Sequence, residues 1–351
     1  MANKLIQPLF SGRIDIVGDI HGEIDALRDL MSVLGYRADG SHPDGRRLVF
    51  IGDLSDRGPD SPAVLDMVSK LVKQGRAQCL LGNHELNLLR EARKEGNGWY
   101  FESDHDRKKN KFRTSRALEA RKRPAIRAFL KGLPIALERS DLRLVHAAWH
   151  TESLAELRSS SSGVLQIYQM HHGKVLQLGN DTGLAEQAER EMRSLGERFT
   201  DPKKRVPFMP AIAALDALYQ DDNPVRILTS GLERVAQRPF FASGKWRFVN
   251  RYAWWHVYRD DIPVIIGHYW RWPRPAVRKK FSRGEPDLFA GYKSNEWIGA
   301  RKNVFCVDFA VGARYKERAL GPSKQFQCRL GAVRWPEREL VMDDATRAPL
   351  R

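Results

Sequence analysis

The chain has 351 residues, enough for one large α/β domain with insertions or for two domains. Charged residues make up 29% and hydrophobic residues 42%, which is typical of a soluble globular protein, and no apolar run is long enough to span a membrane. The formal net charge of +16 predicts attraction to anionic partners without naming any of them.

The first part of the chain alternates between strand-like and helix-like stretches. Apolar runs at 13–22 and 46–58 each contain a Gly-Asp step, and a third at 76–85 ends in Gly-Asn-His-Glu. Between them, 23–36 and 62–75 have the apolar spacing of helices. We expect two consecutive βαβ units, whose three strands are parallel and whose carboxyl ends share one edge of a sheet.

The remaining chain mixes a polar middle with further strands. We expect a helix in the second half of the basic stretch 107–127, and we expect 151–223 to be a helix-rich cap or insertion within a single domain, 1–351. Five later stretches complete the expected order, with a frayed tail from Ala345: strands at 141–150, 224–231, 262–270 and 303–312, and a hairpin at 326–343.

Two features concern the surroundings of the chain. The N-terminal segment MANKLIQPLFSGR has no long apolar core followed by small residues, so we expect no signal peptide. Cys79, Cys306 and Cys328 are widely spaced in apolar contexts, which predicts buried thiols rather than a disulfide framework or a zinc site. These observations predict a cytoplasmic protein that has no membrane partner.

Polar side chains follow each of the three predicted parallel strands. Because ligand sites gather at the carboxyl ends of such strands, we expect these side chains to converge on one pocket. They are Asp19, His21, Asp53, Asp56, Asn83 and His84. His146 and His268 end two later predicted strands and extend the set, although His150 competes with His146 for its place.

The donors in this set are carboxylates, imidazoles and one amide oxygen, without a thiolate. Such donors suit divalent manganese, iron, zinc or magnesium and argue against copper(I) or iron–sulfur chemistry. Six candidate ligands are too many for one tetrahedral ion, so we expect two ions that share a bridging carboxylate and act together on a phosphate ester. The six are Asp19, His21, Asp53, Asn83, His146 and His268.

Five short stretches carry a family resemblance: GDIHG, GDLSDRG and GNHE, followed by VHAAW and IGHYW. In this order they resemble the calcineurin-like metallophosphoesterase superfamily, within the branch that holds the serine/threonine phosphoprotein phosphatases and the symmetrical diadenosine tetraphosphatases. The resemblance implies a four-layer α/β/β/α sandwich, with parallel strands from the first half of the chain and antiparallel strands from the second. It also implies hydrolysis of a phosphate ester by metal-bound hydroxide on two divalent ions, with manganese as the first choice.

The resemblance also implies a metal-binding role for each candidate ligand. Asp53 would bridge the two ions. The other ligands would divide between them, with Asp19 and His21 on the first ion and Asn83, His146 and His268 on the second.

The remaining site residues would act on the substrate. By the same resemblance, His84 would be the general acid that protonates the leaving oxygen, and Asp56 would orient it and keep it charged. Arg57 would grip the phosphoryl oxygens through its planar fork of donors. A second gripping arginine would come from three candidates, with the first preferred: Arg251, Arg226 and Arg234.

Several positions depart from the phosphoprotein phosphatases or stand beside the motifs. Leu81 stands where those enzymes usually carry Arg or Lys, Ser55 stands where they carry an apolar residue, and their His-Gly-Gly motif is HAAW here. We expect Glu85 to place its charge at the N-terminus of the next helix. Asp308 either supports the site or is structural.

Three functional hypotheses follow. The leading one is hydrolysis of a phosphomonoester on a small molecule, a nucleotide or a phosphoprotein. The first alternative is a symmetrical dinucleoside polyphosphate hydrolase, favoured by the high charge and by Leu81. The second is a nucleic-acid-binding protein with a vestigial metal site, which would use the basic stretches 107–127 and 271–283. Trp270 and Trp272 either stack on bases or pack in the core.

Overall fold

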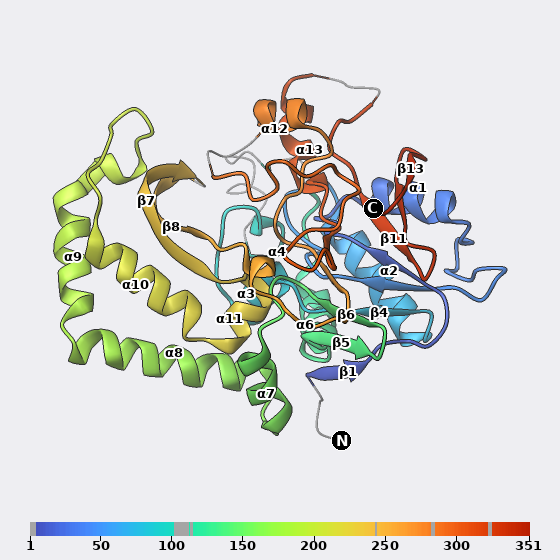
Figure 1. Cartoon of the computed structure of the whole chain (residues 1–351), viewed down its shortest axis with the longest axis horizontal. Coiled ribbons are helices and arrows are strands. Elements are labelled where there is room, and N and C mark those ends of the chain that lie inside the picture. The colour runs from blue at the N-terminus through green and yellow to red at the C-terminus, as the bar shows by residue number, and fades with distance from the viewer. Residues whose placement is uncertain (1–4, 102–111, 113–114, 243, 282–284, 322–324) are drawn as a thin grey trace.

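The computed structural model describes residues 5–101, 112, 115–242, 244–281, 285–321 and 325–351 (Figure 1). Two sheets form the centre of the molecule. The six-stranded sheet has the order β13 (Arg347–Pro349), β12 (Glu339–Met342), β11 (Gly331–Trp335), β2 (Ile14–Val17), β3 (Arg47–Phe50) and β4 (Ala77–Cys79). The five-stranded sheet has the order β1 (Ile6–Pro8), β5 (Ala136–Arg139), β6 (Leu142–Val145), β9 (Val264–Ile266) and β10 (Val304–Cys306).

Side-chain alternation along the strands produces two cores. Ile16 of β2 packs in the same core as Leu144 of the other sheet, so the two sheets face each other. The next residue, Val17, points the opposite way and packs in a second core with Leu27 of α1 (Ile24–Leu34). Helices thus cover the outside of paired sheets, which is the four-layer α/β/β/α arrangement that we expected.

The two predicted βαβ units are confirmed. Strand β2 pairs in parallel with β3, and β3 pairs in parallel with β4. Helix α1 and helix α2 (Ser61–Lys73) make the two crossovers. Each helix is fixed at an end: the Asp60 side chain accepts a hydrogen bond from the Ala63 amide, and Gly35 ends α1 at a left-handed φ of 93°. The carboxyl ends of β2, β3 and β4 therefore lie at one edge of the six-stranded sheet, as the spacing predicts.

Helices dominate the middle of the chain. In Figure 1 they extend sideways as an arm, together with the hairpin of β7 (Glu233–Ala242) and β8 (Lys245–Arg251). The helices are α7 (Thr151–Ser159), α8 (Val164–Asp181), α9 (Leu184–Leu195), α10 (Pro210–Asp221) and α11 (Pro224–Ser230). We call residues 151–251 the arm. The helix-rich character of 151–223 is as predicted, whereas the role of this segment as a cap remains a prediction.

The other helices are short and lie along the loops. They are α3 (Asn83–Leu89), α4 (Gly98–Phe101), η1 (Ala120–Lys122), α6 (Arg123–Lys131), η2 (Gly196–Thr200), η3 (Trp254–His256), α12 (Pro275–Phe281), η4 (Val311–Ala313) and α13 (Arg314–Ala319). The helix predicted in the second half of 107–127 corresponds to η1 and the start of α6. Much of the first half of that basic stretch lies outside the described residues.

Three secondary-structure predictions were wrong. Residues 224–231 form α11 rather than a strand, because the Asn223 side chain accepts from the Val225 and Arg226 amides and Pro224 begins the helix. The tail from Ala345 is not frayed, since β13 pairs antiparallel with β12. The second half of the chain is not purely antiparallel either, because β9 pairs in parallel with β10.

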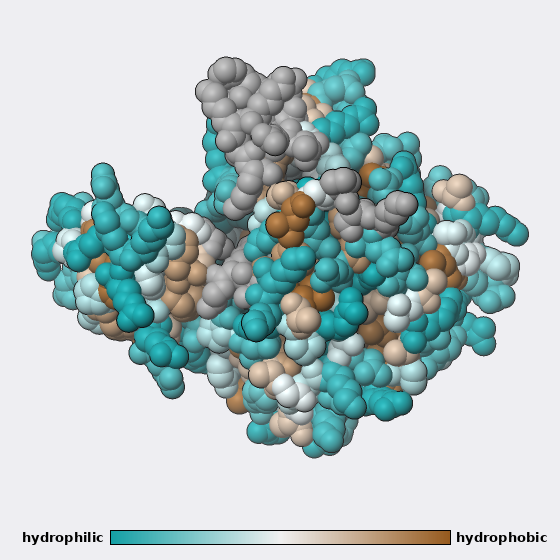
Figure 2. Space-filling view, turned by 90° about the horizontal axis from the view of Figure 1, so that it is seen from above, coloured by the Kyte–Doolittle hydropathy of each residue, from teal (hydrophilic) through white to brown (hydrophobic). Residues whose placement is uncertain are grey.

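The surface and the cysteines agree with the composition. Seen from above (Figure 2), the visible face is largely hydrophilic, with hydrophobic residues in small separate patches. Cys79, Cys306 and Cys328 are buried and free, as predicted. Among the described residues, no helix combines the length and the apolar character needed to traverse a bilayer.

Candidate metal centre

The predicted ligands lie at the ends of five strands from both sheets. Asp19, Asp53 and Asn83 follow β2, β3 and β4, and His146 and His268 follow β6 and β9. These strands come from both sheets, so the two halves of the sandwich contribute to a single site. All of the predicted ligands except Asn83, which is half-buried, are buried.

The backbone of these loops is unusually often left-handed. Five of the eleven described non-glycine residues with positive φ are predicted site residues: His21 (48°), Asp53 (49°), Asp56 (73°), Arg57 (70°) and His268 (67°). Such a conformation costs about 1 kcal/mol or more for a residue with a side chain, so the surrounding fold has to enforce it. Concentrated strain of this kind is typical of functional sites.

Asp53 occupies the middle of the cluster. It belongs to two groups of possible metal ligands, one with His21 and His84 and the other with His146 and His268, and the ligand atoms within each group lie within 4.8 Å of one another. Asp53 Oδ1 is 3.4 Å from His146 Nε2, and Asp53 Oδ2 is 3.8 Å from His21 Nε2. One carboxylate thus lies between two sets of imidazoles, which is the place that a bridging ligand would take.

Asn83 and Asp19 complete the surroundings of Asp53. Asn83 Oδ1 lies 2.9 Å from His268 Nδ1 and 3.3 Å from His146 Nε2. Asp19 Oδ2 lies 3.8 Å from His21 Nε2, and both Asp19 oxygens accept from the His268 amide at 3.1 to 3.2 Å. The structure therefore brings together all six residues that we proposed as ligands.

The electrostatics of this cluster fit divalent cations. Burial, reinforced by the nearby Asp308 carboxylate, holds the pKa of Asp19 well above its ordinary value. Burial alone would raise the pKa of Asp53 as well, but His146 and His84 bring it well below the ordinary value. Several carboxylates packed away from water need positive charge beside them, and oxygen and imidazole donors are those that manganese, iron and zinc accept.

The imidazoles of the cluster differ in their pKa and therefore in their protonation state. Burial and the Arg57 charge lower the pKa of His21, and burial and the Arg251 charge lower that of His268, so both rings are neutral and offer a lone pair. Burial also acts to lower the pKa of His146, but Asp53 raises it to about 10. Because a metal ligand must be deprotonated, occupation of this site would release a proton from His146.

His84 is held by Asp56. His84 Nδ1 lies 2.5 Å from Asp56 Oδ2, while the other carboxylate oxygen accepts from Trp99 Nε1 at 2.6 Å. The Asp56 amide in turn donates to Ser61 Oγ at 2.9 Å. This chain of contacts fixes the ring and leaves its Nε2 atom directed toward Arg57.

Arg57 spans the mouth of the cluster. Its Nη1 lies 2.6 Å from His21 Nε2 and its Nη2 lies 2.9 Å from His84 Nε2. The guanidinium also lies over the ring of Trp270, 4.9 Å from its centroid. Trp270 is buried, which favours packing over exposure to a base for this residue.

Arg251 is the only one of the three arginine candidates whose described contacts reach the candidate ligands. Its Nη1 donates to the His268 carbonyl at 3.2 Å. Arg226 instead donates to Gln220 Oε1, and the exposed Arg234 pairs with Asp221. The preference for Arg251 therefore agrees with the geometry, and its role with phosphate remains a proposal.

Glu85 has a role that the sequence did not predict. It lies in the first turn of α3, but its fully buried carboxylate Oε1 accepts from the Ser55 amide at 3.1 Å and from the Ser55 hydroxyl at 2.9 Å. Burial and the charge of Asp53 raise the pKa of Glu85 to about 7. The carboxylate thus braces the loop that carries Asp53, which also explains a serine at position 55.

Two open questions are also answered by contacts. Asp308 accepts from the Trp270 amide at 2.8 Å and from the Ala310 amide at 2.9 Å, so it fixes the loop that follows His268. His150 caps α7 through Ser153, and the described contacts place His146, not His150, in the cluster.

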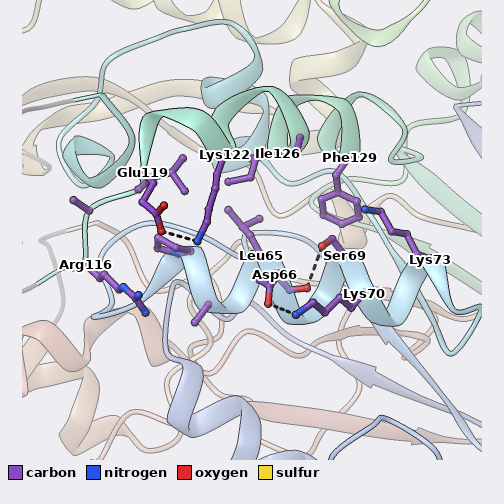
Figure 3. A pocket seen from close by; sticks show the side chains of 15 residues that line it. Leu65, Asp66, Ser69, Lys70, Lys73, Arg116, Glu119, Lys122, Ile126 and Phe129 are labelled. Carbon is purple, nitrogen blue, oxygen red and sulfur yellow. Dashed lines mark hydrogen bonds and ion pairs between the residues drawn. The ribbon is translucent and has the colours of Figure 1, made fainter.

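A separate cavity of about 560 Å³ lies between α2 and α6 (Figure 3). Leu65, Ile126 and Phe129 form much of its apolar lining, and lysines such as Lys70 stand at its edge. Lys70 pairs with Asp66 at 2.7 Å. Within the described part of the chain, none of the predicted site residues lines this cavity.

Comparison with known proteins agrees with the motifs. Residues 12–183 match the model of the calcineurin-like phosphoesterase family. This stretch, just under half of the chain, is therefore similar to that family.

The curated relatives share the motif region. The bis(5'-nucleosyl)-tetraphosphatase PrpE [asymmetrical] of Halalkalibacterium halodurans is 48% identical over 81 residues, which are 22% of this chain and 33% of that protein. The protein of the same name from Oceanobacillus iheyensis is 43% identical over 81 residues, 22% of this chain and 32% of that protein. The chain thus spans about a third of the length of these relatives. A cold-active protein-tyrosine phosphatase of a Shewanella species is a solved structure with a TM-score of 0.46 and 14% identity, covering 98% of this chain and 82% of that one.

Proposed function

We propose that the protein is a metal-dependent hydrolase of phosphate esters. The observation that carries this proposal is the position of Asp53, which lies between His21 on one side and His146 and His268 on the other and close to the His84–Asp56 pair. The residues that would hold two divalent ions, with manganese as the first choice, are Asp19, His21, Asp53, Asn83, His146 and His268. A bound pair of divalent ions supplies Lewis acidity for in-line displacement at phosphorus.

The other residues of the site would position the substrate and move a proton. Arg57 and Arg251 would bind phosphoryl oxygens, because each presents a guanidinium beside the donor cluster. His84, oriented by Asp56 through Nδ1, would give the proton on Nε2 to the leaving oxygen. The buried Asp56 would hold the imidazolium in place during that transfer.

A dinucleoside polyphosphate is the second candidate substrate, beside a phosphomonoester. It is favoured by the names of the curated relatives, which share the motif region with this chain. Those relatives are named asymmetrical hydrolases, so they support the symmetrical mode of cleavage less well. The vestigial-site hypothesis gains no support, since every proposed ligand lies in the cluster.

A substrate panel tests the proposal. The full chain, loaded with manganese, is assayed against nitrophenyl phosphate, a phosphopeptide, diadenosine tetraphosphate and a phosphodiester, with a metal-stripped sample as the control. We expect turnover of at least one phosphate ester that disappears after stripping and returns with manganese. Absence of metal-dependent turnover across the panel would overturn the proposal, and the product of tetraphosphate cleavage distinguishes the symmetrical mode from the asymmetrical one.

A further inference from the structure

Six cations gather where the arm meets the rest of the molecule. They come from three places in the chain: the segment directly after α3, helix α11, and strand β8 of the hairpin. They are Arg90, Lys94, Arg226, Lys245, Arg247 and Arg251. We call them the cationic cluster. In Figure 1, α3, α11 and β8 lie together at this junction, and α11 contacts α3.

A cavity of about 190 Å³ joins this cluster to the candidate metal centre. Its lining includes His268 of the centre and Arg247 and Arg251 of β8, together with the carboxylates Glu233 and Glu285. Since His268 Nδ1 lies 2.9 Å from Asn83 Oδ1, the cavity begins among the proposed ligands. A group bound at the centre can therefore extend along the cavity toward Arg247.

The cluster holds more positive charge than its acidic neighbours balance. Among the residues that the structure describes, the only ion pair within it joins Arg247 Nη2 to Glu233 Oε1 at 3.4 Å. The contacts of the other arginines are neutral: Arg226 donates to Gln220 Oε1, and Arg90 lies over the Tyr168 ring at 3.9 Å. These side chains are left able to accept a further anion.

Mutual repulsion inside the cluster acts on its lysines. Partial burial lowers the pKa of Lys94, and the charges of Arg90, Arg226 and Arg247 lower it further. Burial and the charge of Arg247 likewise lower the pKa of Lys245, although Asp216 and Glu233 act to raise it. Like charges held close together cost folding stability, and such sites are typical of places that bind a charged ligand.

We propose that the cationic cluster binds further phosphate groups of the substrate, those that lie beyond the phosphate under attack. The ligand class is a chain of linked phosphates, as in inorganic tripolyphosphate or a nucleoside polyphosphate. A planar guanidinium pairs with phosphate through two hydrogen bonds, and several cations in a row match a polyanion better than a single phosphate. The inference rests on the proposed function only in assigning these phosphates to the substrate.

The binding test uses the full chain without metal, so that it does not depend on hydrolysis. Calorimetry measures the affinity for inorganic tripolyphosphate in the wild type and in Arg247→Met, Lys94→Met and Arg193→Met. The last is a control on α9, where the exposed Arg193 pairs with Glu189 outside the cluster. We expect the affinity to fall about tenfold in each cluster variant and to stay at the wild-type value in the control. Equal affinities in all four proteins would overturn the inference.

Calorimetry with other anions shows which class of ligand the cluster recognises. Similar affinities for tripolyphosphate and adenosine triphosphate would show that the cluster recognises the phosphate chain itself. A tighter affinity for the nucleotide, lost in the same variants, would show that its source is a nucleoside polyphosphate. A single-stranded oligonucleotide that binds more tightly than either, and that loses affinity in the same variants, would overturn the inference in favour of nucleic acid.

Turnover separates this inference from the proposed function. In the manganese-loaded enzyme we expect the ratio of kcat/KM for diadenosine tetraphosphate to that for nitrophenyl phosphate to fall about tenfold in Arg247→Met and to stay unchanged in Arg193→Met. An unchanged ratio in Arg247→Met, with active wild type, would overturn the cluster's role in the substrate. Tripolyphosphate binding without any turnover would instead contradict the proposed function alone.

Discussion

The candidate metal centre and the cationic cluster both gather charged side chains, and they do so in opposite ways. At the centre, carboxylates and imidazoles alternate, since Asp53 lies between His146 and His21. In the cationic cluster, cations such as Arg226 and Lys94 lie within reach of one another's charge, and among the described residues one ion pair, Arg247 with Glu233, offsets them. The centre is thus balanced largely by its own residues and any metal, whereas the cluster needs an anion from outside. The difference teaches that one pocket can combine a reacting end, which is the candidate metal centre, with a holding end, which is the cationic cluster that would bind the rest of the substrate.

The comparison depends most on Asp53. Replacing it in Asp53→Asn should remove at least one metal ion and lower nitrophenyl phosphate turnover by roughly 10³-fold or more, because both donor groups share this carboxylate. Elemental analysis and a steady-state assay measure the two effects. Asp66→Asn, at an exposed position on α2, is the control. A variant with two ions and a normal rate would rule out the centre as proposed.

His84 tests whether the reacting end also moves a proton. His84→Ala should keep the metal content and lower the rate by about 10²- to 10³-fold, with a larger loss for an alkyl phosphate than for nitrophenyl phosphate. The reason is that an alkoxide needs the proton more than a nitrophenolate does. His256→Ala, an exposed histidine on η3, is the matched control. Equal losses on the two substrates would contradict the role of general acid.

Asn223 tests how firmly the holding end is built. Its side chain caps α11, which carries Arg226, and its amide nitrogen donates to the Tyr168 carbonyl at 3.0 Å. Asn223→Ala should lower the free energy of unfolding by about 1 to 2 kcal/mol, as measured by chemical denaturation. Asn180→Ala, at an exposed position near the end of α8, should change it little. Equal effects of the two changes would show that the cap does not hold α11.

Glu233 gives the smallest expected effect and a test by pH. Burial raises the pKa of Glu233 above its ordinary value, although Arg247, Arg251 and Arg226 act to lower it and Asp216 adds to the rise. The stability that this group contributes is therefore complete below the ordinary pKa and is lost as the pH rises through the higher folded value.

Glu233→Gln removes that loss. We expect the variant, compared with the wild type, to gain stability as the pH is raised from 4 to 8 in a series of thermal melts. A difference between the two proteins that is independent of pH would show that Arg247 and its neighbours balance the carboxylate fully. The cluster would then be less cationic than the comparison requires.

The two regions also differ in how much of them the sequence predicts. Asp19, Asp53 and Asn83 follow strands of two βαβ units, so topology alone brings them to one edge. The cationic cluster has no motif, because Lys94 and Arg247 are separated by a long stretch of chain and meet only through the packing of the arm. A charge in a helical or hairpin stretch looks like ordinary surface until its neighbours are known.

Some features of the centre were also beyond the sequence. The short stretch VRIL at 225–228 fits a strand and a helix equally well, although Asn223 and Pro224 are a helix-start signal that decides for α11. Glu85 fits a helix terminus by position, and only the depth of its burial sends it to Ser55. The left-handed backbone at Arg57 and His268 is set by tertiary packing and leaves no trace in composition.

Those left-handed residues set a limit for anyone who wishes to make the enzyme more heat-resistant. Glycine adopts this conformation without a penalty, so Arg57→Gly would relax the chain where it is most constrained. The same exchange would delete the guanidinium that spans His21 and His84. Selection for thermal stability alone would therefore favour substitutions in this loop first. Stabilising changes that keep the site intact must be sought elsewhere in the molecule.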